Sequence, residues 1–375
     1  MTEFYLIRHV QTEGNLYRVM QGHYDGAVTA LGLRQADLLA ERFREVPVDA
    51  LYSSDLHRAR VTAAAIQRTH PLSLRTDPRL REINVGPWER RFFGDLLYEQ
   101  PALIETFLSR PSEWRLDGAE TVADVTARAC AALRAIAAAN EGRRVAVVSH
   151  GVTLRCLLSH ELGLDVNDRT ALPIAGNTAV SHLFFENGRF RADYINDASH
   201  LEALRLPVWE RSPDLRAAPL DPRTESAYYS ACYADAWRAA HGSLRGYEPE
   251  PYLAGAIEHR AADGRAVLQL LCGDEPMGLV DLDTRRGAGL GVGWVSLLYV
   301  SPAYRHRGCG AQLLGRAVMR YRELGRTALR LHAAESNRAA LAFYERNGFV
   351  CLSSEETELG RLLLLEKKLG EPRHV

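Results

Sequence analysis

Short apolar runs alternate with stretches of helical periodicity over the first 200 residues of the chain. The apolar runs that we interpret as buried strands are 4–9, 49–54 and 143–150. The stretches that repeat apolar residues at helical spacing are 29–46, 55–69, 120–140 and 151–162. A late hairpin is predicted over 178–196, with its turn at 186–189. This alternation predicts a parallel-cored α/β sheet with helices on both faces.

The pattern breaks at 206–222, where four prolines and a lack of periodicity predict a linker. Beyond it, a helix is predicted over 225–242, and strands are predicted within 266–283 and 291–302. Helices after Arg305 and Ser336 and a final strand near 361–369 complete this part. We interpret it as a second α/β domain with an antiparallel-rich sheet. The predicted domains are therefore 1–205 and 223–370.

The composition limits what the two domains can do. A chain of 375 residues suits two domains, each with a hydrophobic core. Its net charge of -1 gives no reason to expect a nucleic-acid or membrane partner. No run approaches the roughly 18 apolar residues of a membrane helix. Six scattered cysteines without a C-x-x-C pair predict reduced thiols, no metal site and a cytoplasmic location.

Cationic side chains gather where the predicted strands end. His9 and His150 each end an apolar strand, Arg8 stands beside the first, and Arg58 follows another strand by one helical turn. Ligands bind beyond the carboxyl ends of strands in open α/β sheets, so we expect these side chains on one rim. Guanidinium groups suit phosphate, and a helix beginning at Gly151 offers free N–H groups to the same anion. The sequence therefore predicts a phosphate site.

Four separated stretches carry a family resemblance: "LIRHVQTEGN", "YSSDLHRARVTA", "LREINVGPWE" and "VAVVSHG". In order and spacing they resemble the histidine phosphatase superfamily, over about residues 1–205. The resemblance implies an open three-layer α/β sheet of phosphoglycerate-mutase-like type. It implies that His9 is the nucleophile, that Glu82 is the proton donor, and that phosphate is held by Arg8, Asn15, Arg58 and His150. Neutral imidazole is a nucleophile near pH 7, and neighbouring guanidinium groups disfavour its protonation. No cofactor or metal is implied for this domain.

The chain departs from that family's pattern at two positions. Val10 stands where the family has Gly after the nucleophile, and Arg90 follows Trp88–Glu89 where Gly is frequent. Val10 is expected to restrict the backbone and add bulk beside the site. Two alternatives to hydrolysis remain: a mutase, or a phospho-ligand-binding module with weakened catalysis. We favour hydrolysis because no insertion suited to shielding a bisphosphorylated intermediate is evident.

A second motif, R-x-x-G-x-G, joins a predicted strand to a helix at 305–310. Together with "ESNRAALAFYERNGFV" it resembles the GNAT acetyltransferase family over about 223–370, which implies a mixed, largely antiparallel sheet. The resemblance implies acetyl-CoA as cofactor, with its pyrophosphate on the loop and its pantetheine arm along Leu298 to Val300. It implies that Tyr344 protonates the leaving thiolate. The implied cofactor contacts are Leu298, Val300, Arg305, Arg307, Gly308, Cys309, Gly310 and Asn337. Asp281 and Glu335 are both open as the general base.

We therefore expect a bifunctional cytoplasmic enzyme that hydrolyses a small phosphorylated metabolite and acetylates an amine. The segment 90–114 is predicted to be a lid that sets the phosphatase's specificity, although its Phe92, Phe93 and Trp114 could equally be core residues. Each motif set is complete within its own half. We therefore expect neither half to borrow residues from the other.

Overall fold

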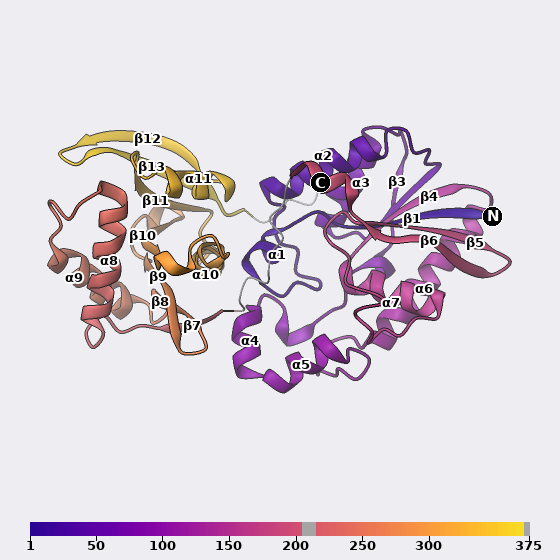
Figure 1. Ribbon diagram of the computed structural model, residues 1–375, viewed down its shortest axis with the longest axis horizontal. Coiled ribbons are helices and arrows are strands. Elements are labelled where there is room, and N and C mark those ends of the chain that lie inside the picture. Colours follow the sequence, from indigo (N-terminus) through magenta and orange to yellow (C-terminus); the bar gives the residue numbers. More distant parts are fainter. Residues whose placement is uncertain (205–214, 371–375) are drawn as a thin grey trace.

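The computed structural model describes residues 1–204 and 215–370 and contains two sheets, each the centre of one lobe (Figure 1). The first sheet has the strand order β3-β2-β4-β1-β5-β6. Its strands are β1 (Thr2–Arg8), β2 (Ala50–Ser53), β3 (Leu74–Thr76), β4 (Arg144–Ser149), β5 (Val180–Glu186) and β6 (Arg189–Asp197). Strands β1 to β4 pair in parallel, and β5 and β6 add an antiparallel hairpin. Two of the three strands predicted for this parallel core, β1 and β4, lie next to each other at its centre.

Seven helices belong to the first lobe: α1 (Glu13–Tyr17), α2 (Ala30–Arg42), α3 (His57–Gln67), α4 (Phe93–Glu99), α5 (Pro101–Ser109), α6 (Val122–Ala139) and α7 (Gly151–Leu162). Thr29 and Thr121 cap α2 and α6 by accepting backbone N–H bonds, as Thr at a helix start does. The short helices α4 and α5 lie in the segment predicted to be a lid. Its Trp114 is fully buried against Phe107, with ring centroids 5.0 Å apart, so this tryptophan is a core residue.

Alternate residues of β1 feed two separate cores. Phe4 and Leu6 belong to the cluster beneath α6 and α7, whereas Tyr5 and Ile7 belong to the cluster beneath α2 and α3. Side chains of a strand point to opposite faces in turn, so the unbroken apolar stretch Phe4–Ile7 fits a sheet covered on both sides. The predicted three-layer arrangement is confirmed. The polar end of β1 is left at the carboxyl rim of the sheet.

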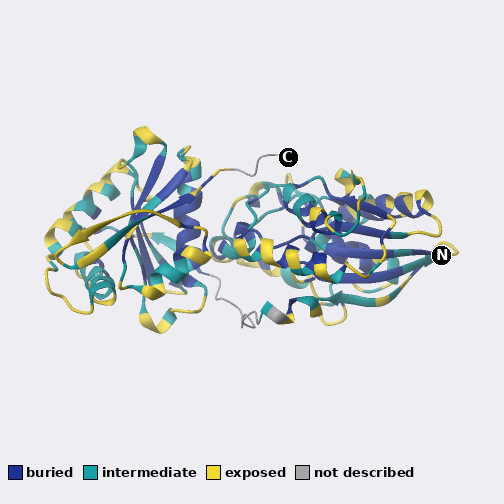
Figure 2. Ribbon diagram, turned by 90° about the horizontal axis from the view of Figure 1, so that it is seen from above, coloured by how far each residue is buried: buried dark blue, intermediate teal, exposed yellow. Residues whose placement is uncertain are grey.

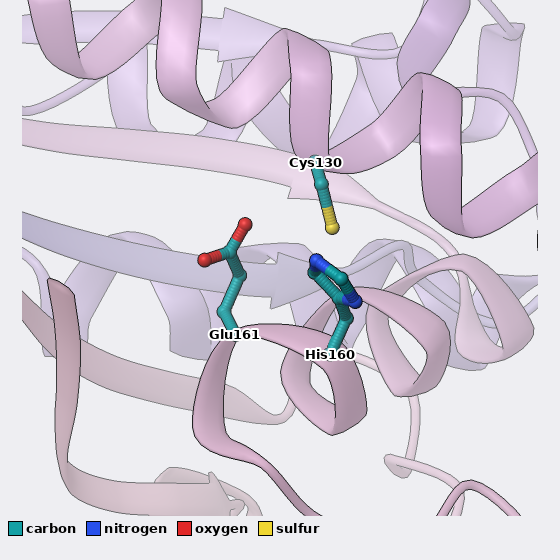
Figure 3. A group of neighbouring side chains, drawn as sticks. All are labelled: Cys130, His160 and Glu161. Atoms are coloured by element: carbon teal, nitrogen blue, oxygen red, sulfur yellow. The ribbon is translucent and has the colours of Figure 1, made fainter. Parts of the chain in front are cut away.

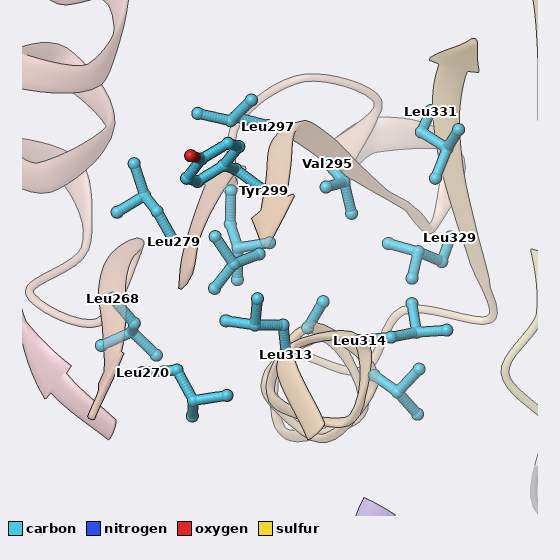
Figure 4. Packing of buried hydrophobic residues seen from close by; sticks show 14 of the residues in the cluster. Leu268, Leu270, Leu279, Val295, Leu297, Tyr299, Leu313, Leu314, Leu329 and Leu331 are labelled. Atoms are coloured by element: carbon cyan, nitrogen blue, oxygen red, sulfur yellow. The ribbon is translucent and has the colours of Figure 1, made fainter. Parts of the chain in front are cut away.

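The second sheet has seven strands in the order β12-β13-β11-β10-β9-β8-β7. They are β7 (Arg216–Pro219), β8 (Val267–Cys272), β9 (Glu275–Asp283), β10 (Val292–Val300), β11 (Ala328–Ala334), β12 (Val350–Thr357) and β13 (Gly360–Lys368). The helices are α8 (Ser226–His241), α9 (Pro249–Ala262), α10 (Cys309–Glu323) and α11 (Arg338–Arg346). Within the described part of this lobe, only β10 and β11 pair in parallel, so the expected mixed and largely antiparallel sheet is confirmed. Leucines of α10, Leu313 and Leu314, pack on this sheet (Figure 4).

The segment predicted as a linker is only partly one. Residues 206–214 of the predicted linker lie outside the described residues. Residues 216–219, however, form strand β7, which pairs with β8 at the edge of the second sheet. The four prolines of 206–222 obscured this short edge strand, which ends on Pro219. Proline is tolerated in an edge strand because one side of the strand needs no ladder partner. The second lobe therefore begins no later than Arg216.

In both lobes the sheet is buried and the helices that cover it are partly exposed (Figure 2). Helix α1 of the first lobe packs against α10 of the second (Figure 1). Tyr17 and Val19 are 1% and 6% exposed and belong to the hydrophobic cluster of the second lobe. A Cβ atom at Gly315 of α10 would lie 2.6 Å from the side chain of Tyr17, so the close approach requires glycine there. The two lobes therefore share part of one hydrophobic core, and the expectation that each motif set is complete within its own half stays a prediction.

Ion pairs reinforce this contact between the lobes. Glu13 is 4% exposed, and its carboxylate lies 2.7 Å from Arg322 and 2.8 Å from Lys367. Burial raises the pKa of Glu13, but the two cations outweigh burial and hold this pKa below its ordinary value. Asp95 of α4 likewise pairs with Arg316 of α10, with Nη2 at 2.9 Å. The first turn of α1 is thus held by side chains of the second lobe.

Among the described residues, no helix combines the length and the apolar character needed to cross a membrane.

Candidate active site

The two strand-end histidines come together at the carboxyl rim of the first sheet. Strands β1 and β4 are parallel neighbours, with Arg8 opposite Ser149, so His9 and His150 follow at the same level. Their ring centroids are 5.1 Å apart. Both residues are buried, at 2% and 0% exposure. The predicted convergence of these side chains on one rim is what the sheet produces.

Hydrogen bonding fixes the tautomer of His9. Its Nδ1 lies 2.7 Å from the carbonyl oxygen of Val10, and because a carbonyl can only accept, Nδ1 carries the proton. The neutral ring therefore keeps the lone pair of Nε2. Burial, then Arg58 and then Arg8 hold the pKa of His9 well below its ordinary value, so the ring is neutral at pH 7.

The guanidinium groups near the histidines are held by backbone carbonyls. Arg58 is fully buried and donates to the carbonyls of Gly22 at 2.7 Å and Tyr24 at 3.0 Å, and it pairs with Asp25 at 3.0 Å. Arg8 donates to the carbonyl of Ala175. These contacts use the terminal nitrogens of the two arginines and leave their Nε atoms free to bind another group.

Four buried nitrogens of this rim have no hydrogen-bond partner within the described part of the chain. They are Nε of Arg8, Nε of Arg58, and Nδ1 and Nε2 of His150. Burial, then Arg58 and His9 hold the pKa of His150 well below its ordinary value. A neutral His150 donates through only one of its ring nitrogens, so the rim offers three unpaired donors among the described residues. Buried polar atoms are normally paired, so these three donors are suited to an anion. The arrangement can hold a phosphate group beside Nε2 of His9.

The side chain of Glu82 contacts the N-terminus of α7, the helix that begins directly after His150. Its Oε1 accepts the backbone N–H of Thr153 at 3.0 Å and the hydroxyl of Thr153 at 3.1 Å. Its Oε2 accepts the N–H of Val152 at 3.1 Å. A carboxyl group fits this position because the free N–H groups and the dipole of the helix are positive there. Glu82 is therefore fixed beside the histidine pair.

Asn15, a predicted phosphate contact, is linked to the backbone of His9 by Asn177. Sequence reasoning missed Asn177. Nδ2 of Asn177 donates to the carbonyl of His9 at 2.9 Å and lies 3.4 Å from Oδ1 of Asn15. Asn15 also caps its own helix, accepting from Thr12. Asn177 precedes β5, the antiparallel neighbour of β1, and its place just before an apolar run was the available signal.

The two departures from the family pattern have structural explanations. The side chain of Val10 is fully buried in the core beneath α2 and α3, so the expected bulk beside the site is not found. Arg90 has φ 65°, a left-handed conformation that favours glycine and accounts for the family's frequent Gly at this position. The Arg90 guanidinium lies 4.8 Å from the ring centroid of Tyr24.

The second candidate site lies where β10 runs into α10. Gly308 is the N-cap of α10 with φ 81°, and the helix N–H groups that follow, from Cys309 and Gly310, are those an anion would meet. Arg305 instead donates to the carbonyl of Val300 at 3.0 Å. Arg307 lies 5.8 Å from the ring centroid of Tyr304.

Strands β10 and β11 are paired only over Val292–Trp294 and Ala328–Arg330. A bulge follows between Val295 and Leu297, after which β10 continues to Leu298 and Val300 without pairs to β11. A strand end that is unpaired on one side can take an extended ligand. That Leu298 and Val300 contact pantetheine stays a prediction.

The remaining predicted residues of this site lie on α11. Oδ1 of Asn337 caps the helix by accepting from Ala340 at 3.2 Å. Tyr344 is 8% exposed and packs on Phe343 and Phe349, and burial raises its pKa. Its phenol is therefore protonated at neutral pH.

Both candidates for the general base are already paired. Asp281 is 1% exposed and accepts from Tyr229 and from His259 Nδ1, each at 2.8 Å. Burial lowers the pKa of His259, but Asp281 outweighs burial and raises it above its ordinary value. Glu335 lies 3.7 Å from Arg361. The structure singles out neither as a base.

One group of three possible metal ligands occurs among the described residues, Cys130, His160 and Glu161, at facing turns of α6 and α7 (Figure 3). Glu161 already pairs with Nε and Nη2 of Arg134, at 3.0 and 2.5 Å. Burial raises the pKa of Cys130 to about 12. Because the thiol of Cys130 is protonated and the carboxylate of Glu161 is paired with Arg134, we interpret this group as a packing and ion-pair cluster between two helices.

Comparison with known proteins follows the two lobes. The description "Histidine phosphatase superfamily (branch 1)" matches residues 4–198, and "Acetyltransferase (GNAT) family" matches 228–349. A probable phosphoglycerate mutase GpmB of Proteus mirabilis is 34% identical over 216 residues, covering 56% of this chain and all of that protein. The corresponding Enterobacter protein is 32% identical with the same coverage. Bacillus stearothermophilus YhfR superimposes with a TM-score of 0.52 at 30% identity, covering 54% of this chain and all of YhfR.

A fold with a buried histidine pair, two arginines and a glutamate at the carboxyl rim of its sheet defines a phosphoryl-transfer protein of the histidine phosphatase type. The chain belongs to the histidine phosphatase superfamily, and it carries a GNAT domain in the same polypeptide.

Proposed function

We propose that the chain is a bifunctional enzyme, in which the first lobe hydrolyses phosphomonoesters through a phosphohistidine and the second transfers an acetyl group to an amine. The observation that carries the first activity is the set of buried, unpartnered nitrogens of Arg8, Arg58 and His150 around a neutral His9. The runner-up is phosphoryl transfer of the mutase type. Release of free phosphate as the product, rather than an isomeric phosphate ester, separates the two.

The reaction proceeds in two displacements at phosphorus. Nε2 of His9 attacks, the N–P bond forms, and the bond to the leaving alkoxide breaks as Glu82 gives that oxygen a proton. Arg8, Arg58 and His150 stabilise the charge on the transferring phosphoryl group, which is where most of the catalysis must arise. Water then attacks phosphorus, Glu82 takes a proton from that water, and breakage of the N–P bond releases inorganic phosphate and His9.

Replacing Glu82 with glutamine tests this assignment. We expect turnover of alkyl phosphates to fall by about 10²-fold or more, because an alkoxide needs a proton to leave. An activated aryl phosphate should lose less than about fivefold, since a phenolate leaves unaided. The measurement is kcat/KM for both substrate types with purified wild type and Glu82→Gln, because kcat/KM reports the displacement of the leaving group and not the later hydrolysis of the phosphohistidine, in which Glu82 also acts. Equal losses on both would remove Glu82 from the donor role.

For the second lobe, the residues fit acetyl-CoA: Gly308 opens α10 in a left-handed conformation, and β10 leaves β11 before Leu298. Acetyl-CoA supplies the acetyl group as an activated thioester. The loop 305–310 would bind its pyrophosphate through backbone N–H groups. The phenol of Tyr344, kept protonated by burial, is the group that gives a proton to the leaving thiolate.

Two glycines at opposite ends of α10 give a matched test. Gly308 and Gly325 have φ 81° and 68°, so an alanine strains both backbones alike, by about 1–2 kcal/mol. We expect Gly308→Ala to weaken acetyl-CoA binding about tenfold in calorimetry, because only this Cβ stands where the anion meets the helix. Gly325→Ala should bind within about twofold of wild type. Similar affinities for both variants would contradict the assigned loop.

A cytoplasmic location completes this proposal. All six cysteines are free thiols, as a reducing compartment requires. The partners we propose are a small phosphorylated metabolite and an amine acceptor.

A further inference from the structure

A small hollow lies beside α7, on the side of the phosphatase site that holds Glu82. Its volume is about 30 Å³, room for about two water molecules. Its lining is apolar apart from a single arginine, and includes Phe107, Leu108, Val152, Val166, Ile174 and Arg155. The apolar residues come from α5 and the turn after it, from the first residue of α6, from α7 and from the segment after α7. We call this space the Arg155 hollow.

Arg155 is an unpaired cation in this apolar setting. It is 5% exposed, and its Nε and Nη2 have no hydrogen-bond partner within the described parts of the chain. Asp165 and Asp168 lie near enough to favour its charge, yet neither forms an ion pair with it. Their Oδ1 atoms accept instead from the N–H groups of Asn167 and Thr170, each at 2.8 Å. A buried cation without a partner is unfavourable, so the presence of Arg155 points to a ligand that accepts hydrogen bonds from its Nε and Nη2.

The free edge of Arg155 is the edge that binds carboxylates elsewhere in this molecule. Arg134 holds Glu161 through Nε and Nη2 at 3.0 and 2.5 Å. Arg144 holds Asp49 through the same two nitrogens, each at 3.0 Å. Nε and Nη2 point in parallel, which matches the two oxygens of a carboxylate. The hollow is also small, which favours a planar carboxylate over a bulkier group.

The hollow adjoins the reaction centre. The N–H of Val152, which lines it, donates to Oε2 of Glu82 at 3.1 Å. Ile174, also in the lining, lies 3.1 Å from where a Cβ of Gly151 would be, and Nε of Arg8 lies 3.3 Å from the same point. Glu82 protonates the leaving oxygen in the proposed reaction, so the hollow is on the side toward which the alcohol part of a substrate extends.

We propose that the Arg155 hollow binds a carboxylate on the alcohol part of the substrate, which makes the substrate a phosphorylated carboxylic acid with a short apolar spacer. This inference rests on the proposed phosphatase function. It assigns to Arg155 the choice between acids and neutral phosphate esters. The side-on guanidinium edge holds the acid group, which fills the hollow, and the apolar spacer lies between the hollow and the phosphate site.

The test compares ω-phosphooxy carboxylic acids of increasing chain length with their neutral amides, and uses phenyl phosphate as a substrate without an acid. At the best chain length, we expect wild type to prefer the acid by about 10- to 100-fold in kcat/KM. Arg155→Gln should reduce this preference to about twofold and leave phenyl phosphate turnover within about twofold. Arg169→Gln is the matched control, an exposed neighbouring cation, and should keep the preference. Arg155→Lys should restore only part of it, because lysine lacks the paired edge.

Several outcomes would overturn the inference. They are no acid preference at any chain length, a preference that survives Arg155→Gln, or an Arg155-dependent preference for bisphosphates over the acids. Phenyl phosphate separates the two levels of the argument, since turnover by wild type without an acid preference rejects only the Arg155 assignment. Binding of the same acids and amides to His9→Ala, measured by calorimetry, decides the role of Arg155 even without turnover.

Discussion

Replacing His9 with alanine should lower phosphatase turnover by about 10⁴-fold or more while the protein stays folded, because the variant lacks the atom that forms the covalent bond. Nε2 of His9 is the lone pair that the hydrogen bond to Val10 leaves free, and burial with Arg58 keeps it unprotonated. In the proposed site His150 holds the phosphate, so it does not replace His9 as the nucleophile. The measurement is kcat on an aryl phosphate, together with the melting temperature.

A second buried histidine of the same sheet provides the matched control. His182 is 8% exposed and stacks on Tyr5 with ring centroids 4.6 Å apart, but it lies on β5 and outside the phosphate site. We expect His182→Ala to lower the melting temperature and to keep kcat within about threefold. A comparable collapse of kcat in both variants would mean that the loss in His9→Ala comes from unfolding.

Quenching wild type in alkaline denaturant during turnover of a labelled substrate should trap the phosphoryl group on His9, since the proposed intermediate is a phosphoramidate, whose N–P bond survives base but not acid. Label on a different residue, or none despite rapid turnover, would exclude His9 as the nucleophile.

The sequence predicted those parts of the site that depend on local pattern. Apolar runs located β1 and β4, and parallel pairing then required His9 and His150 to meet at one rim. Arg58 was found because it follows a strand by one turn. The N-caps Thr29 and Thr121 also depend on local pattern, since the signals for a helix start lie within four residues.

What the sequence did not predict depends on contacts between distant residues. In the stretch "GVTLRCLLSHEL", Arg155 reads as a solvated position of an amphipathic helix, and only the packing of α5 and the segment after α7 buries it. Val10 was expected to add bulk beside the site. Its side chain instead points into the core beneath α2 and α3, a direction that the local sequence does not show. The five residues of α1 are too few for periodicity, and Glu13 and Lys367, its partner, are far apart in sequence.

That last contact leads to the second large effect that we expect: a fragment of residues 1–204 should lose phosphatase activity about tenfold or more, or fail to fold. Removing the second lobe exposes Tyr17 and Val19 and leaves Glu13 without Arg322 and Lys367. Breaking a buried ion pair by removing one partner costs about 3–5 kcal/mol, a large share of a domain's stability. Helix α1, which carries Asn15, is the element that would lose its support.

Within the full chain, two arginines of α10 separate this support from general stability. Arg322 binds Glu13 of the first lobe at 2.7 Å, whereas Arg320 binds Asp263 of its own lobe, also at 2.7 Å. We expect Arg322→Ala to lower phosphatase kcat/KM by about fivefold to tenfold and Arg320→Ala to leave it within about twofold. Both should lower the melting temperature, so that the difference in activity, not in stability, reports on α1. If the fragment and both variants match the full chain in kcat/KM, the second lobe contributes nothing to the phosphatase site, and the buried contact between α1 and α10 serves only to hold the lobes together.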